Sequence, residues 1–220
     1  SAALERIERL PGVANAALAT IPPFHIVHAR MTLTGSDIAD GSAEVQRNEV
    51  SPDYFEAVGV RILQGRTFSD DEVRRQLPVA IISASLAKQF WGDGNALGAT
   101  LDRVWGPPDK PGEGTGNLHR KPAGTRIIGV VTDSMTQIDD HGLPTIYLPI
   151  DVGHAVVHMV IATHGTPRAV QQDVRRELLA LDPDLRSYML LPSEKMREGL
   201  KASRALAGIT SAIGASALAL

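Results

Sequence analysis

The chain has 220 residues, enough for one large domain or two small ones, and its composition of 43% hydrophobic but only 4% aromatic residues predicts a mainly aliphatic core. A formal net charge of -3, with no run of Lys or Arg, argues against a nucleic-acid partner, because phosphate binding needs a concentrated basic face. The chain has no cysteine, which excludes disulfides, cysteine-ligated zinc and a thiol nucleophile.

The first fifty residues predict one helix and two strands. Leu4, Ile7 and Leu10 recur on one side of a short amphipathic helix, and Pro11-Gly12 ends it. The predicted elements are a helix at 2–10, a strand at 13–20, a loop from Ile21 to about Ala43, and a strand at about 44–50.

A second helix is predicted to begin at Ser51-Pro52-Asp53. Ser51 would cap the helix, Pro52 suits its first turn, and Asp53 suits the positive end of the helix dipole. Gly59 would follow the C-cap. The side chains expected to pack inward are Tyr54, Phe55 and Val58.

The middle of the chain predicts short elements separated by glycine-rich turns. They are an extended piece at 60–63, a turn at Gly65-Arg66, a strand at 78–82, a helix capped by Ser83 or Ser85 and running to Trp91, a strand at 100–105, a hairpin loop at 106–124, a strand at 126–132 and a short edge strand at 145–148 closed by Pro149. Gly129 marks either a close approach of two chain segments or a bulge.

The last third has a strand–helix–strand rhythm. A strand at 156–163 precedes a helix from Pro167 to Leu181, and Asp182-Pro183 ends that helix before a strand at 186–191. The apolar face of the helix would carry Val170, Val174, Leu178 and Leu181.

The final stretch predicts the first turns of a membrane-spanning helix. No charged residue follows Arg204, although the apolar run is slightly shorter than the about 20 residues that a span needs. Gly208, Ala212 and Ser216 form a small-residue stripe that would let helices approach closely in lipid. The alternative is an amphipathic helix packed on the domain. No signal peptide opens the chain at Ser1, so an upstream membrane helix is expected to direct its export.

Three phrases carry a resemblance to a known family. They are VSPDYFEAVGVRILQGRTFSDDE (50–72), PVAIISASLAKQFWGDGNALGATL (78–101) and RIIGVVTDSMTQIDDHGLPTIYLP (126–149). In order and spacing the chain resembles the extracytoplasmic core domain of ABC-transporter permeases of the macrolide-exporter and FtsX-like type. Within that group it is most similar to the duplicated orphan permeases of bacteria. The loop at 106–121 departs from the family pattern.

The resemblance implies an α+β fold with two lobes. A porter-like lobe of βαβ units would combine residues 1–60 and 150–192, and a smaller, strand-rich α/β lobe would be inserted at 61–149. Residues 193–220 would form a helix leading into a truncated transmembrane segment. The domain would lie on the periplasmic side of the bacterial inner membrane, between the first two transmembrane helices.

The resemblance also implies a mechanical function, in which the domain couples ATPase-driven motion of membrane helices to export or to work in the envelope. The expected partners are the protein's own transmembrane helices and, indirectly, a cytoplasmic ABC ATPase. A periplasmic adaptor protein and a homo-oligomer are both compatible with this function. No G-x-x-x-x-G-K-[ST] phrase occurs in the chain, so a nucleotide site of that type would lie elsewhere.

The histidines and acidic residues do not predict a reactive site. His154 and His158 are four apart, but on a strand that spacing separates them by about 13 Å. The segments Asp139-Asp140-His141 and Asp70-Asp71-Glu72 suit a turn and a helix start respectively. His25 and His28 lie in a predicted loop, and His164 is another isolated histidine, so none of them suggests a metal site. The glycines at 112–116 do not open a helix, as a phosphate-binding loop would.

We therefore predict no catalytic, cofactor-binding or metal-binding residue, and no enzymatic activity. Arg66 and Asp70 are expected to form a structural ion pair at the turn after Leu63. Two alternatives remain open from the sequence. The first is a stand-alone periplasmic module that binds a ligand or a protein, and the second is a metal-dependent hydrolase with converging Asp and His side chains.

Overall fold

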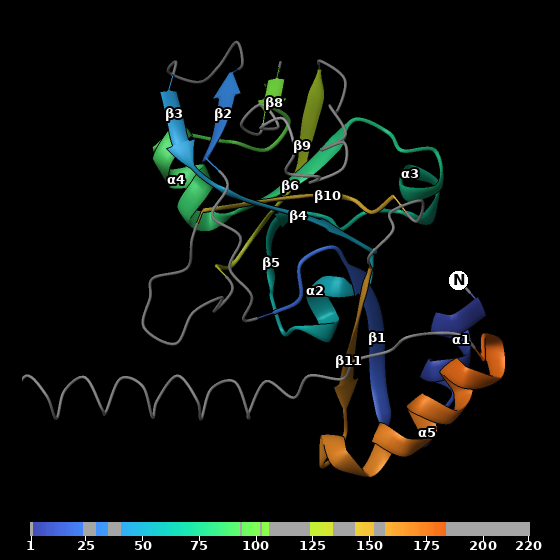
Figure 1. Cartoon of the computed structure of the whole chain (residues 1–220). Helices are drawn as coiled ribbons and strands as arrows, with labels where there is room; N and C mark the ends of the chain where they lie inside the picture. The colour runs from blue at the N-terminus through green and yellow to red at the C-terminus, as the bar shows by residue number, and fades with distance from the viewer. Residues whose placement is uncertain are drawn as a thin grey trace, which may run out of the picture.

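The computed structural model describes residues 2–23, 30–34, 41–92, 94–101, 103–105, 124–133, 144–151 and 157–183. Within these ranges the chain has the predicted α+β fold, with helices packed on a large sheet (Figure 1). In chain order the elements are α1 (Ala2–Glu8), β1 (Val13–Ala19), β2 (Arg30–Thr34), β3 (Gly41–Glu44), β4 (Gln46–Val50), α2 (Tyr54–Ala57), β5 (Ile62–Gly65), α3 (Asp70–Arg74), β6 (Val79–Ser83), α4 (Ala84–Trp91), β7 (Thr100–Leu101), β8 (Arg103–Trp105), β9 (Thr125–Val131), β10 (Thr145–Pro149), β11 (His158–Thr163) and α5 (Pro167–Leu181).

The described strands form two sheets. In the main sheet, which has eight strands, the order is β11-β1-β4-β10-β6-β9-β5, and β7 also pairs with β9. The pairs β4–β10 and β6–β9 are parallel, and the other neighbouring strands of this sheet are antiparallel. The second sheet has the order β3-β2-β8 and is antiparallel throughout.

Three groups of buried hydrophobic side chains hold the helices on the main sheet. The first lies under α4, the second under α2, and the third between the paired strands β1 and β11 and helices α1 and α5. Figure 1 shows α1 and α5 side by side next to β1 and β11, at the opposite end of the molecule from the small sheet. The third group consists of Ile7, Val13, Ala16, Val170 and Val174.

Most predicted elements are confirmed within one or two residues. Helix α5 begins at Pro167 and ends at Leu181 as predicted, with Val170 and Val174 buried and Leu181 exposed. Ser83 is the residue that caps α4, and its side chain accepts a hydrogen bond from the Leu86 N–H. The predicted strand at 186–191, the terminal helix from 193 and most of the loop at 106–124 lie outside the described residues.

Three of the predicted elements were wrong. The expected loop at 21–43 contains β2 and β3, because the β-branched residues Thr32 and Thr34 favour a strand more strongly than the preceding prolines oppose one. The expected edge strand is β10, which lies between β4 and β6 in the middle of the sheet. Pro149 is tolerated there because it is the last residue of the strand. The expected strand at 100–105 is divided between β7 and β8, which belong to different sheets.

A continuous sheet joins the two parts of the chain that we predicted as lobes. β1, β4 and β11 come from the predicted porter-like lobe, whereas β5, β6, β7, β9 and β10 come from the predicted insertion. The two sets meet where β4 pairs with β10. Among the described residues, no helix is long and apolar enough to cross a bilayer.

Candidate functional site: a junction in the main sheet

The shortest ladder between neighbouring strands of the main sheet joins β1 to β4. These strands share a single register pair, Ala19 with Val50, whereas β4 and β10 share five. Backbone hydrogen bonds flank that pair on both sides, from Thr20 N to Glu49 O and from Ser51 N to Leu18 O, each 2.9 Å long. The antiparallel pair of β1 and β11, with α1 and α5 packed on it, is therefore attached to the rest of the sheet through a short ladder; we call these four elements the β1–β11 unit.

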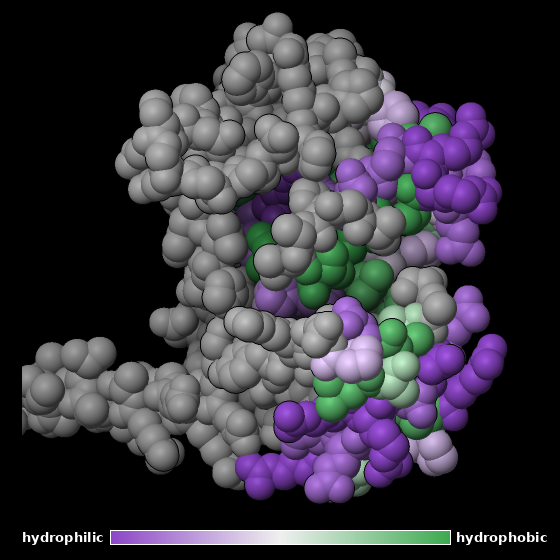
Figure 2. Space-filling view, turned by 45° about the vertical axis from the view of Figure 1, so that its right-hand side comes forward, coloured by the Kyte–Doolittle hydropathy of each residue, from purple (hydrophilic) through white to green (hydrophobic). Residues whose placement is uncertain are grey.

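We call this region the junction and define it as residues 18–21, 46–52 and 150–151. The first and last of these segments carry the chain from β1 toward β2 and from β10 toward β11. The middle segment is β4 together with the start of the connection to α2. Figure 2 shows the surface hollowed between an upper and a lower hydrophilic region, with hydrophobic side chains between them.

Strand β4 supplies most of the polar groups of the junction. Its five residues, QRNEV, are all buried, although the first four are polar or charged. Buried polar groups need partners, because their desolvation is not otherwise repaid. The partners of this strand lie far away in sequence, in the segments that precede β2 and follow β10.

Asn48 holds the segment that follows β1. Its Oδ1 accepts hydrogen bonds from Ile21 N (3.0 Å) and Thr20 Oγ1 (3.3 Å), and its Nδ2 donates to Ile21 O (2.9 Å). Thr20 Oγ1 also accepts a bond from Glu49 N at 3.0 Å. One amide side chain thus satisfies both backbone groups of Ile21, which fixes the exit of β1 against β4.

Glu49 and Arg47 form a buried ion pair on the opposite face of β4 from Asn48. Their side chains are only 5% and 8% exposed, respectively. Glu49 Oε2 also accepts a hydrogen bond from Asp151 N at 3.4 Å, so the same side chain holds the segment that follows β10. Replacing either charge alone would take the opposite charge of this pair away from a side chain that stays buried.

Ser51 does not cap α2, which corrects the prediction. Its Oγ accepts a hydrogen bond from Leu18 N at 2.9 Å across the junction, and Asp53 occupies the N-cap position without a side-chain cap bond. The Leu18 N–H, near the end of β1, has this hydroxyl as its hydrogen-bond acceptor, because β1 and β4 pair only briefly here. Gly59 follows the helix with φ +73°, as predicted.

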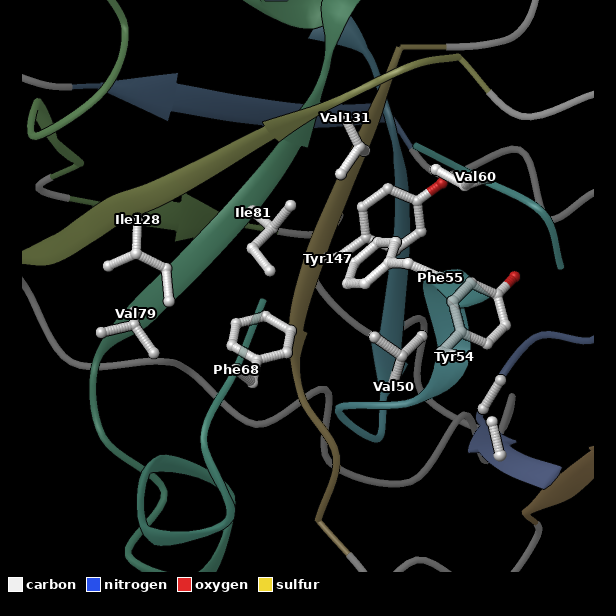
Figure 3. Close-up of a cluster of buried hydrophobic side chains, with 12 residues drawn as sticks. Val50, Tyr54, Phe55, Val60, Phe68, Val79, Ile81, Ile128, Val131 and Tyr147 are labelled. Atoms are coloured by element: carbon white, nitrogen blue, oxygen red, sulfur yellow. The ribbon is translucent and has the colours of Figure 1, made fainter. Parts of the chain in front are cut away.

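An aromatic cluster lies beneath the junction. Phe55 and Tyr147 pack edge to face with ring centroids 5.0 Å apart, and Tyr54 and Phe68 lie against them (Figure 3). Burial raises the pKa of Tyr54, so its hydroxyl stays protonated and lies 3.4 Å from Asn48 Nδ2. Because α2 contacts both β1 and β11, the hydrophobic group that contains this cluster spans the junction.

The predicted ion pair of Arg66 with Asp70 was wrong. Arg66 instead donates two hydrogen bonds of 2.7 Å to the Glu72 carboxylate. Ser69 caps α3, and Glu72 bonds back to the Ser69 N–H to complete a capping box, which turns the Glu72 side chain toward Arg66. The hydrogen bonds from Arg66 are the largest cause that lowers the pKa of Glu72 to about 2.

This arrangement predicts a pH dependence of stability in the acid range. The folded pKa of Glu72, about 2, lies below its ordinary value of 4.5, so its contribution is complete above pH 4.5 and is lost as the pH falls toward 2. We expect Glu72→Gln to remove this component, about 1 kcal/mol because Arg66 is half exposed. Urea unfolding at several pH values from 2 to 7 measures it. An unchanged acid slope in the variant would contradict the assignment.

The candidate reactive residues do not gather in the described structure. His158 lies in β11 opposite Ala19, and His164 follows the end of that strand. Within the described ranges, no group of three or more His, Cys, Asp or Glu residues has an arrangement that could hold a metal ion. His154, the segment 139–141, the glycines at 112–116 and the two histidines at 25 and 28 lie outside the described residues.

This fold is shared with the external domains of bacterial transporters. It is similar to the crystal structure of the periplasmic region of MacB from Actinobacillus actinomycetemcomitans, with 14% identity, a TM-score of 0.54, and coverage of 91% of this chain and 81% of that one. It is also similar to the extracellular domain of the noncanonic ABC-type transporter YknZ from Gram-positive bacteria, with 16% identity, a TM-score of 0.54, and coverage of 87% and 88%.

The family follows from a match over most of the chain. The model of the MacB-like periplasmic core domain matches residues 2–177, and the chain belongs to this family. It is accordingly an extracytoplasmic domain of an ABC-transporter permease. Comparison with curated proteins gave no match.

Proposed function

We propose that this domain transmits mechanical work between the membrane helices of a permease and the periplasm. In this proposal a cytoplasmic ABC ATPase moves the transmembrane helices. The β1–β11 unit, which includes α1 and α5, follows that movement and rotates against the rest of the sheet. The observation that carries the proposal is the single register pair between β1 and β4. A sheet resists bending through its ladder of hydrogen bonds, so the shortest ladder is where it bends most easily.

The finer assignments follow from the same proposal. The domain would lie on the periplasmic side of the bacterial inner membrane, in a permease of the FtsX-like or duplicated orphan type. Of the porter-like lobe, residues 1–60 and 150–192, the parts that move would be β1, β11, α1 and α5, whereas β4 would stay with the inserted lobe at 61–149. Residues 193–220 would lead into the membrane. A periplasmic adaptor and a second copy of the chain are candidate partners for the moving surfaces.

A disulfide across the junction tests the proposal directly. Ala19 and Val50 are a non-hydrogen-bonded antiparallel pair, because the bonds from Thr20 N and Ser51 N flank them rather than join them. Such a pair has its Cα atoms about 4.5 Å apart, within the range that a disulfide spans. Because the chain has no cysteine, Ala19→Cys with Val50→Cys introduces the only thiols of this domain.

In the full-length permease reconstituted with its ATPase, oxidation of this pair is expected to uncouple ATP hydrolysis from movement of the domain, and reduction to restore it. Movement is read with and without nucleotide from the distance between labels on non-canonical amino acids in α4 and α5, which leave the engineered pair as the only thiols of the domain. The matched control is Val13→Cys with Thr163→Cys, a register pair of β1 and β11 that lies outside the junction, beside the bond from His164 N to Gly12 O. Full coupling in the oxidised junction variant would refute the mechanical function.

A further inference from the structure

Residues 65–76 form a segment that we call the α3 strap. One end of the strap is fixed to β9, where Arg66 N donates a hydrogen bond to Ile128 O at 3.1 Å. The contact leaves no room for side chains, since a Cβ on Gly129 would lie 2.5 Å from Arg66 O. The start of the strap is therefore held rigidly by a strand outside the junction.

The other bonds of the strap reach the junction. Thr67 Oγ1 donates to Pro52 O at 2.9 Å, and Gln76 Nε2 donates to Ile150 O at 2.7 Å. Pro52 and Ile150 lie in two different segments of the junction, one after β4 and the other after β10. The strap thus holds two of the three junction segments from outside the sheet, through backbone carbonyl groups.

Gln76 has a strained backbone. Its φ is +51°, and it is the only residue other than glycine with a positive φ among those that the structure describes. Glycine and asparagine adopt this conformation at lower cost. Such strain persists only where surrounding contacts impose it. Here Gln76 directly follows the C-cap of α3, and the backbone bonds from Gln76 N to Val73 O (3.1 Å) and from Leu77 N to Glu72 O (2.9 Å) impose this conformation. The Gln76 side chain bridges Val73 O at 2.8 Å and Ile150 O.

We propose that the α3 strap restrains opening of the junction and that the bond from Gln76 to Ile150 is its release point. The Arg66–Glu72 ion pair and the capping box keep α3 a rigid unit between its two ends. Rotation of the β1–β11 unit would move the segments at Pro52 and Ile150, which would stretch the bonds from Thr67 and Gln76. This inference rests on the proposed mechanical function.

The test uses Gln76→Asn, since asparagine tolerates the same φ but its side chain is one methylene too short to keep the bond to Ile150 O. Spin labels are placed at Gln89→Cys and Gln172→Cys, exposed positions on α4 and α5. In the full chain we expect a broader distance distribution and at least tenfold faster amide exchange in residues 144–151. Gln76→Gly removes both the strain and the bond and is expected to behave alike.

Ser85→Ala is the matched control, because it removes a side-chain hydrogen bond outside the junction, from Ser85 Oγ to Asp133 Oδ1, and the Oγ contact to Ser83, while the bond from Ser85 N to Asp133 remains. It is expected to leave the distance distribution and the exchange of 144–151 as in the parent chain. Unchanged distances and exchange in both Gln76 variants would overturn the strap. If the distances and exchange stay unchanged while the Ala19–Val50 disulfide still uncouples the permease, only the strap proposal is refuted and the mechanical function stands. If they change while that disulfide has no effect, the strap stands as a restraint and the mechanical function fails.

Discussion

Replacing Glu49 with glutamine is expected to lower the free energy of unfolding by about 3–5 kcal/mol, because it removes the negative charge that faces the buried Arg47 guanidinium. The two side chains are 5% and 8% exposed, so water does not solvate the remaining charge. Glutamine keeps the size of the side chain and an oxygen for the Asp151 N–H, which the native carboxylate accepts. The loss therefore reports the charge itself, and urea unfolding of the 220-residue chain at pH 7 measures it.

The double variant Arg47→Met with Glu49→Gln separates the charge from the packing. With neither charge buried, its free energy of unfolding is expected to return to within about 1 kcal/mol of the parent value, since an apolar replacement of a buried pair is often neutral. A single variant that loses less than about 1 kcal/mol, or a double variant as unstable as the single one, would show that the pair is not the principal electrostatic contact of the junction.

The local elements were largely predictable because their signals are local. Pro167 in the first turn and Asp182-Pro183 after the last turn mark both ends of α5. The order of strands was not predictable in this way. β10 reads as an edge strand from its length and its terminal proline, yet it pairs with β4 and β6, which lie about 60–100 residues earlier in the chain.

The junction shows most clearly what a sequence leaves open. A polar strand such as QRNEV predicts a solvated surface, and only the folded chain shows that Asn48 and Glu49 are buried against segments 27 and 102 residues away. The partner of Arg66, in contrast, could have been predicted from a local sequence motif. Ser69 and Glu72 have the spacing of a capping box, and that motif identifies Glu72 as the residue held near Arg66.

A second large effect is expected from Gly65→Ala, about 3 kcal/mol or more of lost stability. Gly65 has φ +73°, which costs an alanine about 1–2 kcal/mol in itself. A Cβ there would also lie 2.1 Å from the backbone Ile128 O and 2.7 Å from Leu97 Cδ1. Because the nearer atom belongs to the backbone of β9, the strand itself must shift, which adds about 1–3 kcal/mol. Thermal or urea unfolding of the chain measures the total.

Gly59→Ala is the control that isolates the clash. Gly59 has the same φ, +73°, but a Cβ there would meet nothing within 4 Å. Its cost is expected to be the conformational part alone, about 1–2 kcal/mol. The difference between the two variants measures how firmly β5 and the start of the α3 strap are held against β9. If both substitutions cost the same, β5 moves away from β9 without resistance, and the strap lacks the fixed end that it needs to restrain the junction.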